Sequence, residues 1–360
     1  MIHFFLSFSK DAANSPIARC IAESGIEFRI MAGRVSHQYR HKVWMVFVGR
    51  PLTAWFGLRA AFRSLVLARP APRIVVVGTH IEALIVAILR RLFCRDAKIV
   101  LLGFILTSRS NYFHNWLRTW YFRRVFSVVD LAIVHSSIEA ARYADIFRGL
   151  RTRFTYVPWG THVNGLEALR QADQRQSAGD QIYVLSAGRS GRDYPCLFNA
   201  FHGSARKLRV VCDMAAALKG CHAAPNIEVL DHCYGGDYIR VLWGASCVVI
   251  PLAVDDISAG QMVLLQAMAM GKPIIITKTS TTSEYVTHDH DALLVPSGDP
   301  EAIRAAVERI FAEPELLAHL SRNAEASFQN RFSIPAYVRG LLGAIHDLES
   351  PRSLVDTAKP

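Results

Sequence analysis

A polar loop followed by an apolar helix, in the last third of the chain, has residue types suited to binding an anion. The loop runs through Ser258, Ala259 and Gly260 to Gln261, where we expect the helix to begin. Serine commonly caps a helix, and a helix start leaves backbone N–H groups without partners inside the helix. These donors and the positive end of the helix dipole favour a phosphate group. Taken alone, the segment fits a capped core helix before a buried strand better.

A second loop with the composition of a phosphate site follows the strand expected at Tyr183–Ala187. It contains Gly188, Arg189, Gly191 and Arg192. Glycine lets the backbone approach a ligand closely, and guanidinium groups bind phosphate oxygens through charge-assisted hydrogen bonds. An ordinary strand–helix turn with solvated arginines explains this loop equally well in isolation.

Together, the two segments resemble the C-terminal half of family 4 glycosyltransferases, which have the GT-B fold. That family typically has a Gly-Arg strand-end loop with a second basic residue nearby, and a Glu-x7-Glu helix that ends in Glu-Ala-Met-Ala-x-Gly-x-Pro-Val. The matching text here is Gly188-Arg189 with Arg192, and the sequence LQAMAMGKPI at Leu265–Ile274. Further similar segments follow at Ser283–Val286, Ala292–Pro296, Gly298-Asp299 and Arg331–Ser333. The resemblance covers about residues 181–345 and is weak before them.

The resemblance implies a role for each matching residue. Arg189 and Arg192 would neutralise the diphosphate of a nucleotide-sugar donor, and the backbone at Ala259–Gln261 would hold the distal phosphate or the transferred sugar. Gln266 takes the place of the second glutamate, which binds the ribose hydroxyls in the family. Family membership also implies transfer with retention of configuration and without a metal, in which the leaving phosphate helps to deprotonate the acceptor. No side-chain nucleophile is then needed.

Both family glutamates are replaced in this chain. Gln266 lies eight residues after Ser258, about 12 Å along the helix axis at ~1.5 Å per residue, and its carbonyl can still accept a hydrogen bond from a ribose hydroxyl. Ser258 stands at the first glutamate position and supplies no charge. The neighbouring Asp255-Asp256 pair could contribute one, although an acidic loop before a helix start is the better explanation.

Four further residues are candidates from their positions after predicted strands. His232 and Tyr234, with Asp231, follow a strand near the expected cleft edge and could frame the nucleotide base; an exposed turn explains them almost as well. His80 and Arg109 follow strands of the N-terminal half and could contact the acceptor or the sugar. Single residues of these types are more often structural.

Several function classes lack their sequence signatures. The chain has no G-x-G-x-x-G dinucleotide fingerprint and no G-x-x-x-x-G-K-[ST] phosphate loop, which argues against a dehydrogenase and a P-loop enzyme. The Asp255-Asp256 pair does not make an Asp-x-Asp metal motif, and no His/Asp cluster has convincing metal-ligand spacing, so neither a cofactor nor a metal is expected. The seven cysteines include no C-x-x-C pair, which favours free thiols.

Strand and helix patterns alternate along the whole chain, which predicts an α/β protein with parallel sheets. With the resemblance, we expect the GT-B fold: two Rossmann-like domains facing a central cleft, with a C-terminal helix that crosses back to the N-terminal domain. The expected parts are a basic N-terminal domain over residues 1–170, a nucleotide-sugar-binding domain over 171–334, and a crossover helix with a polar tail over 335–360.

Positive charge is concentrated in the first half. Residues 1–170 hold 24 lysines and arginines against nine acidic residues, whereas the remainder holds 17 against 21. Aromatic residues alternate with arginines at Asn111–Phe126, and Trp55 and Phe56 lie near further arginines. Such segments suit the headgroup level of an anionic bilayer, although an amphipathic core helix is at least as good an explanation alone.

The best hypothesis is a cytoplasmic glycosyltransferase that is peripherally attached to the inner membrane leaflet. No apolar run reaches the ~18 residues of a spanning helix, and the start lacks a basic leader. The expected partners are a nucleotide-sugar donor and an anionic membrane surface or lipid-linked acceptor, with no nucleic acid. The alternatives are a non-catalytic GT-B protein that binds nucleotide or glycan and, less favoured, a basic nucleic-acid-binding protein.

Overall fold

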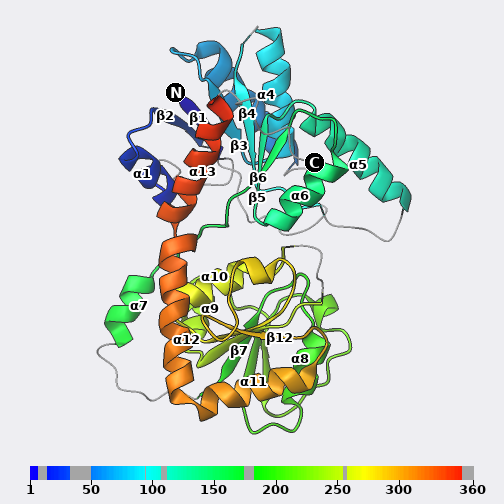
Figure 1. Ribbon diagram of the computed structural model, residues 1–360, viewed down its shortest axis with the longest axis vertical. Helices are drawn as coiled ribbons and strands as arrows, with labels where there is room; N and C mark the ends of the chain where they lie inside the picture. The colour runs from blue at the N-terminus through cyan, green and yellow to red at the C-terminus, as the bar shows by residue number, and fades with distance from the viewer. Residues whose placement is uncertain are drawn as a thin grey trace, which may run out of the picture. The chain divides into compact units, whose positions relative to one another are not determined.

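A computed structural model of the 360-residue chain describes residues 1–6, 14–32, 50–93, 95–106, 112–173, 182–253 and 258–350. These residues form two compact units (Figure 1). The N-terminal unit is Met1–Val157 together with the C-terminal helix from Tyr337 onward, and the C-terminal unit is Pro158–Ala336. The boundary expected at residue 170 falls inside a helix of the C-terminal unit, α7 (Leu166–Asp173).

The N-terminal unit is built on a parallel six-stranded sheet in the order β2-β1-β3-β4-β5-β6. Its strands are β1 (Ile2–Leu6), β2 (Phe28–Ala32), β3 (Ile74–Val77), β4 (Lys98–Leu102), β5 (Leu131–Val134) and β6 (Arg153–Tyr156). Its helices are α1 (Pro16–Glu23), α3 (Arg50–Phe62) with the π-helical turn η2 (Arg63–Leu67), α4 (His80–Leu92), α5 (Tyr112–Phe126), α6 (Ser137–Ile146) and α13 (Ile334–Glu349).

Local signals in the sequence explain where these helices begin. Ser15 caps α1 by accepting a hydrogen bond from the Ala18 amide, and Pro16 occupies the first turn, as the sequence predicts. Thr79 and Glu82 form a capping box at α4, in which each side chain binds the other residue's backbone. The apolar faces of α3, α4, α5 and α6 then pack in one core with alternate residues of the strands.

The C-terminal unit contains a second parallel six-stranded sheet, in the order β12-β11-β10-β7-β8-β9. Its strands are β7 (Val184–Ala187), β8 (Leu208–Val211), β9 (Ile227–Leu230), β10 (Cys247–Ile250), β11 (Ile274–Thr277) and β12 (Leu293–Val295). Its remaining helical elements are α8 (Tyr194–Phe201), η3 (Ala215–Leu218), α9 (Gly236–Trp243), α10 (Gln261–Ala269), η4 (Thr282–Glu284), α11 (Pro300–Ala312), α12 (Pro314–Ser327) and η5 (Phe328–Phe332).

This sheet has a core on each face, because successive strand residues point to opposite sides. Leu185 and Ile250 belong to the core that contains α9 and α10, whereas Val184 and Val249 belong to the core that contains α8 and α11. The central strand β10 is therefore apolar along its whole length, as expected for a parallel sheet covered on both faces.

The α/β class and both parallel sheets agree with the sequence-based prediction, and β3 and β5 have the predicted bounds. The apolar run Val43–Val48 predicts a strand, which lies outside the described residues. The sequence also predicts a helix over Cys196–Lys207, whereas α8 ends at Phe201. There the Asn226 side chain donates hydrogen bonds to the carbonyls of Phe201, Ser204 and Arg206, which holds the chain in a turn.

The last helix, α13, starts in the C-terminal unit and belongs to the N-terminal unit from Tyr337 onward, as the GT-B expectation requires. Two cationic side chains bind its last turn. Lys98 donates to the Leu348 carbonyl at 2.7 Å, and Arg153 donates to the Asp347 carbonyl at 2.9 Å. Cations at a helix C-terminus satisfy free carbonyls and complement the helix dipole, so they anchor α13 to its own unit.

Candidate functional site

The strand order of the C-terminal unit fixes the place where a ligand site is expected. β7 and β10 are neighbours in the sheet, yet the chain builds β8 on one side of β7 and β11 on the other side of β10. The loops that leave the carboxyl ends of β7 and β10 therefore diverge, and open α/β sheets bind ligands at such a point. The loop with Gly188, Arg189 and Arg192 follows β7 directly.

Backbone hydrogen bonds hold this loop in place. Gly188 has a φ of 118°, a conformation that favours glycine, and its carbonyl accepts a 2.6 Å hydrogen bond from the Tyr194 hydroxyl. The Gly191 carbonyl accepts from the Ala253 amide at 3.0 Å, which ties the loop to the segment after β10. Asp193 ends the loop by capping α8. The loop is thus fixed before any ligand binds.

Arg192 is folded back across this loop. Its Nε donates to the Ala187 carbonyl at 2.9 Å and its Nη1 to the Ser190 carbonyl at 3.1 Å. A Cβ at Gly188 would come within 2.5 Å of its Nη2, so the guanidinium needs glycine there. Burial lowers the pKa of Arg192, while interactions with Tyr194 and Tyr238 act in the opposite direction. A guanidinium keeps its charge at cellular pH in any case, so this is a desolvated, fixed cation.

The start of α10 lies beside this cation. Gly260, not Ser258, occupies the cap position, with a φ of 82° and no side-chain cap bond. The predicted serine cap is therefore wrong: the left-handed turn that starts the helix needs glycine, and it comes two residues after Ser258. A Cβ at Gly260 would be 3.0 Å from Ile250 Cγ2 and 3.6 Å from Arg192 Nη1. The backbone at this helix start and the Arg192 guanidinium thus lie at one place.

Arg189 points to a different partner. Its Nε lies 3.4 Å from Asp213 Oδ1, and its side chain is 55% exposed. The other oxygen of Asp213 accepts a 2.8 Å hydrogen bond from the Tyr234 hydroxyl. Asp213, which follows β8 and was not singled out from the sequence, therefore joins two predicted site residues. The sequence predicts a strand over Leu208–Val211, and the position of Asp213 two residues after it was the signal that could have identified this residue.

Gln266 and a tyrosine complete the group. The Tyr238 hydroxyl, on α9, donates a 3.1 Å hydrogen bond to Gln266 Oε1. Burial raises the pKa of Tyr238, so its hydroxyl remains protonated. Tyr238 also interacts with Arg192, which connects α9 to the loop after β7. The sequence places Tyr238 at the start of a predicted helix but indicates no role for it.

The remaining candidates lie apart from this group or outside the described residues. His232 is strongly exposed, with Nε2 3.6 Å from Asp231 Oδ2. His80 is the first residue of α4, in the N-terminal unit, where its ring packs edge-on against Tyr121 and Phe122 at 5.6 Å. Arg109 and the Asp255-Asp256 pair lie outside the described residues.

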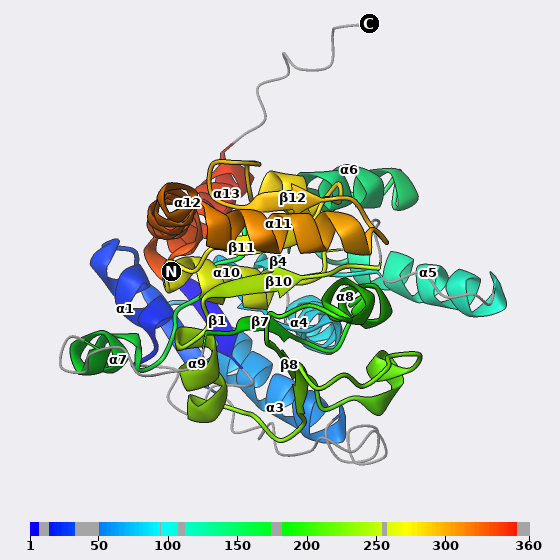
Figure 2. The same cartoon turned by 90° about the horizontal axis from the view of Figure 1, so that it is seen from below.

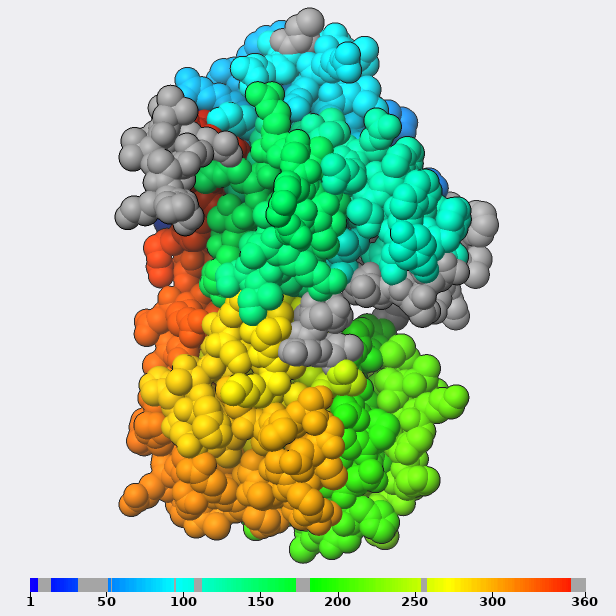
Figure 3. Space-filling model, turned by 45° about the vertical axis from the view of Figure 1, so that its right-hand side comes forward, coloured from blue at the N-terminus to red at the C-terminus, as the bar shows by residue number. Residues whose placement is uncertain are grey.

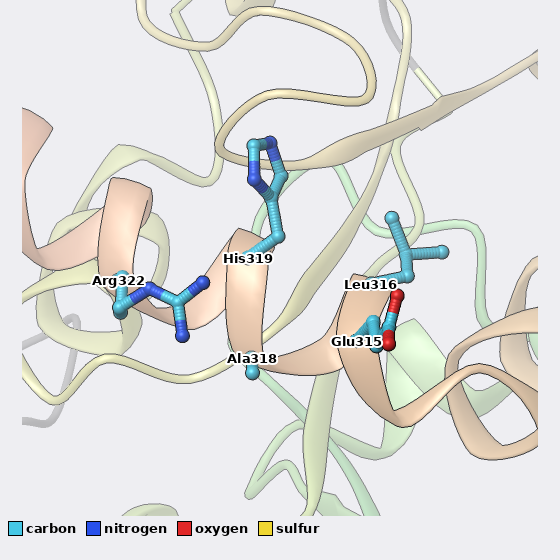
Figure 4. Close-up of a pocket in the computed structure, with 5 residues that line it drawn as sticks. All are labelled: Glu315, Leu316, Ala318, His319 and Arg322. Carbon is cyan, nitrogen blue, oxygen red and sulfur yellow. The ribbon is translucent and has the colours of Figure 1, made fainter.

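A hollow of about 510 Å³ lies on the surface of the C-terminal unit, away from these residues (Figure 4). All of its lining residues come from α12: Glu315, Leu316, Ala318, His319 and Arg322. It is shallow and is lined by a single helix, so it lacks the convergent polar groups of a ligand site.

The described residues contain neither a metal cluster nor a spanning helix. No group of three or more His, Cys, Asp or Glu side chains among them is arranged to hold a metal ion. No helix in the described ranges is long and apolar enough to cross a membrane.

Comparison with known proteins connects this geometry to a family. Residues 196–313 match the model of the family described as "Glycosyl transferases group 1". D-rhamnosyltransferase WbpZ of Pseudomonas aeruginosa is 26% identical over 153 residues, which are 42% of this chain and 38% of that protein. Lipopolysaccharide core biosynthesis glycosyltransferase LpsD of Rhizobium meliloti is 34% identical over 71 residues, 20% of this chain and 21% of that protein. The match thus spans well under two thirds of either relative.

Solved structures resemble the whole chain. Sucrose-phosphate synthase of Thermosynechococcus elongatus matches with a TM-score of 0.68 at 16% identity, covering 96% of this chain and 98% of that one. Anabaena Alr3699/HepE, determined in complex with UDP-glucose, matches with a TM-score of 0.64 at 13% identity, covering 96% and 100%. Identities this low show the fold alone, and they confirm the prediction of the GT-B fold.

Proposed function

We propose that the chain transfers a sugar from a nucleotide diphosphate sugar to an acceptor, on the premise that residues 196–313 match the family model of the group 1 glycosyl transferases. One observation carries the proposal. The desolvated Arg192 guanidinium, the close backbone approach at Gly188 and the helix start at Gly260 meet where the strand order reverses. A fixed cation beside the amides of a helix start is the chemistry that binds a diphosphate.

Each residue of the group has a proposed part in donor binding. Arg192 binds the diphosphate from the loop after β7, and Arg189 adds a second, exposed cation. The backbone of Ser258, Ala259 and Gly260, with the Gln261 amide, holds the distal phosphate or the sugar. Gln266 binds the ribose. Tyr234 and His232 lie on the segment after β9, where they would contact the base. Anabaena Alr3699/HepE, which shares the fold, binds UDP-glucose and UDP, and this supports a nucleotide donor.

The proposed mechanism rests on positioning and charge. Transfer retains the configuration of the sugar, and the leaving phosphate deprotonates the acceptor, so the protein holds both reactants and stabilises the diphosphate as it leaves. Arg189 and Arg192 offer two positive charges for this purpose, and the proposed reaction uses no bound metal. Turnover that survives EDTA supports this point, whereas turnover restored only by added Mg²⁺ or Mn²⁺ contradicts it.

We propose a membrane-presented acceptor, such as a lipid-linked oligosaccharide of envelope or exported polysaccharide synthesis. The names of WbpZ and LpsD place those relatives in rhamnosyl transfer and lipopolysaccharide core synthesis. In this chain, α5 projects from its unit (Figure 1, Figure 2) and forms part of the surface drawn in teal in Figure 3. Its exposed apolar side chains are Tyr112, Phe113, Trp116, Leu117 and Trp120.

Arginines accompany these side chains along α5. The Arg124 guanidinium lies 5.4 Å from the centre of the Trp120 ring, and Arg123 is exposed one residue earlier. Aromatic rings beside cations suit the headgroup level of an anionic bilayer, which an inner leaflet facing the cytoplasm provides. We therefore propose peripheral attachment there, with His80 and Arg109 on the acceptor side.

A second candidate is a non-catalytic GT-B protein that binds nucleotide or glycan as an assembly partner. The observation that favours it is the loss of both family carboxylates, with Ser258 and Gln266 in their places. This protein would bind a nucleotide and show no transfer or hydrolysis.

The decisive experiment has two stages. Thermal unfolding is first measured with a panel of UDP- and GDP-sugars, because a ligand of the native state raises the unfolding temperature by mass action. The stabilising donor is then incubated with membrane lipid extract, and labelled product and free nucleotide are counted. Transfer supports the enzyme. Binding without turnover supports the second candidate, and failure of every nucleotide to bind overturns both.

A further inference from the structure

Tyr238 contacts, through its hydroxyl, the side chain proposed to bind ribose. It lies in the first turn of α9, and its hydroxyl donates to Gln266 Oε1 at 3.1 Å. Its ring is packed against the core that contains α10. A tyrosine held by its ring in this way presents its hydroxyl from a fixed position.

The contact matters because the end of a glutamine side chain has two different groups. Oε1 accepts hydrogen bonds, whereas Nε2 donates them, and rotation of the amide exchanges the two. The family carboxylate has two equivalent oxygens, so it presents an acceptor in either orientation. Replacing it by Gln266 makes the orientation of the group important.

Tyr238 determines that orientation. Burial raises the pKa of Tyr238, so the hydroxyl keeps the proton that it donates, and Oε1 is the partner that accepts it. Nε2 is then the end of Gln266 that makes no bond with Tyr238, and its N–H groups can donate to a ligand. A ribose hydroxyl can accept from Nε2 as well as donate to an oxygen.

We propose that Tyr238 is a positioning residue that orients the Gln266 amide so that Nε2 donates to a ribose hydroxyl of the donor. The pair thereby selects ribonucleotides over deoxyribonucleotides. This inference rests on the proposed function, since it needs a nucleotide in the site. It assigns Tyr238 no contact with the reacting atoms.

The test compares ribose and deoxyribose probes. Calorimetry measures the Kd of UDP and 2′-deoxy-UDP, and of GDP and 2′-deoxy-GDP, together with the 3′-deoxy analogues. One hydrogen bond is worth about fivefold to tenfold in Kd, so the wild-type protein should prefer ribose by about that factor. Tyr238→Phe should reduce this preference to about twofold, and Gln266→Ala should abolish it.

A double-mutant comparison separates positioning from general damage to the fold. In a Gln266→Glu background both carboxylate oxygens are acceptors, so Tyr238→Phe should leave the ribose preference unchanged. Tyr183→Phe removes a hydroxyl that donates to the Val241 carbonyl of α9 at 2.6 Å and has no proposed part in donor binding. It serves as the matched control and should also leave the ribose preference unchanged.

Each outcome has one meaning. A ribose preference that survives Tyr238→Phe overturns the inference while leaving nucleotide binding intact. A preference that Tyr238→Phe removes equally in the wild-type and Gln266→Glu backgrounds also overturns it, because Tyr238 would then act by another route. Failure of the wild-type protein to bind any of the nucleotides overturns the proposed function and this inference with it.

Discussion

The two units share one architecture but place their distinctive chemistry differently. In the C-terminal unit, cations and helix-start amides gather where loops leave adjacent strands, and glycines at positive φ define the site. In the N-terminal unit, the distinctive surface is a helix face of exposed aromatic side chains and arginines. A site made by backbone geometry suits one small ligand, whereas a surface of exposed rings and cations suits a broad partner such as a bilayer. The proposed function therefore assigns a different kind of recognition to each unit.

The units also differ in the polar side chains that they bury. The N-terminal unit buries His3 within β1 and His135 directly after β5, whereas the buried polar side chains described for the C-terminal unit are hydroxyls and Asp291, with no histidine. Burial lowers the pKa of His3 and of His135 to about 4 in each case. The two units should therefore respond differently to acid.

The largest expected effect is a loss of stability in the N-terminal unit as the pH falls. The folded pKa values near 4 lie below the unfolded value of 6.5, so below pH 6.5 the unfolded chain binds protons that the folded chain does not. Stability is present above pH 6.5 and falls until about pH 4, by about 3 kcal/mol for each histidine. Urea titrations give the free energy of unfolding at about pH 6.5 and at about pH 5. Between these two pH values each histidine should lower it by ~2 kcal/mol.

His135→Asn provides the control for this prediction. His135 Nδ1 lies 3.0 Å from the Val157 carbonyl, and an asparagine amide can donate to the same oxygen without titrating. Between the two pH values, the free energy of unfolding of the variant should fall by about 2 kcal/mol less than that of the wild-type protein. Equal losses would show that this histidine does not contribute to the difference between the units.

The next effect tests the C-terminal site. Arg192→Ala should weaken donor binding about a hundredfold, because a desolvated guanidinium makes charge-assisted hydrogen bonds of about 1.5–3 kcal/mol each. Arg322→Ala, an exposed arginine of α12 in the same unit, is the matched control and should change the Kd by less than about twofold. Calorimetry with the donor found in the thermal panel makes the comparison. Similar losses in both variants would indicate a general effect of charge.

A smaller effect is expected at the second arginine. Arg189 is more than half exposed and is shared with Asp213, so Arg189→Ala should reduce donor binding or turnover by about tenfold, equivalent to ~1.4 kcal/mol. Steady-state kinetics across donor concentrations would assign the loss to kcat or to KM. Unchanged kinetics would remove Arg189 from the site and leave Arg192 as its cation.

The sequence predicted much of the C-terminal unit because local signals agree with the fold there. Apolar runs mark β7 and β10, and the residues after β7 contain the glycine and both arginines of the site. The true cap of α10 was missed, because Ser258 has the better capping side chain, while the positive φ and the close approach of Ile250 and Leu252 select glycine at 260. That constraint comes from residues distant in sequence.

The contacts of Asp213 and Tyr238 illustrate the same limit. Asp213 joins Arg189 to Tyr234, and Tyr238 donates to Gln266, but the residues of each contact come from different loops or helices. Side-chain periodicity places a residue on its own element and does not specify which neighbour it meets. Parallel strand order brings these elements together, and only the folded chain shows the pairing.

The smallest effect concerns the exposed face of α5 in the N-terminal unit. Trp116 is 54% exposed and stacks on Phe113 at 6.0 Å, so it presents an apolar surface beside the arginines. Trp116→Ala should lower partitioning onto anionic vesicles of phosphatidylglycerol by about fivefold, since one ring leaves the interface while the positive charges remain. Co-sedimentation with vesicles measures the change. Ile182→Ala, at an apolar residue of the C-terminal unit that is 65% exposed, should have no effect. If both variants bind vesicles as the wild-type protein does, α5 is not a membrane surface. The same conclusion follows if generic DNA competes fully with the vesicles. In either case only the interpretation of the C-terminal unit as a ligand site stands.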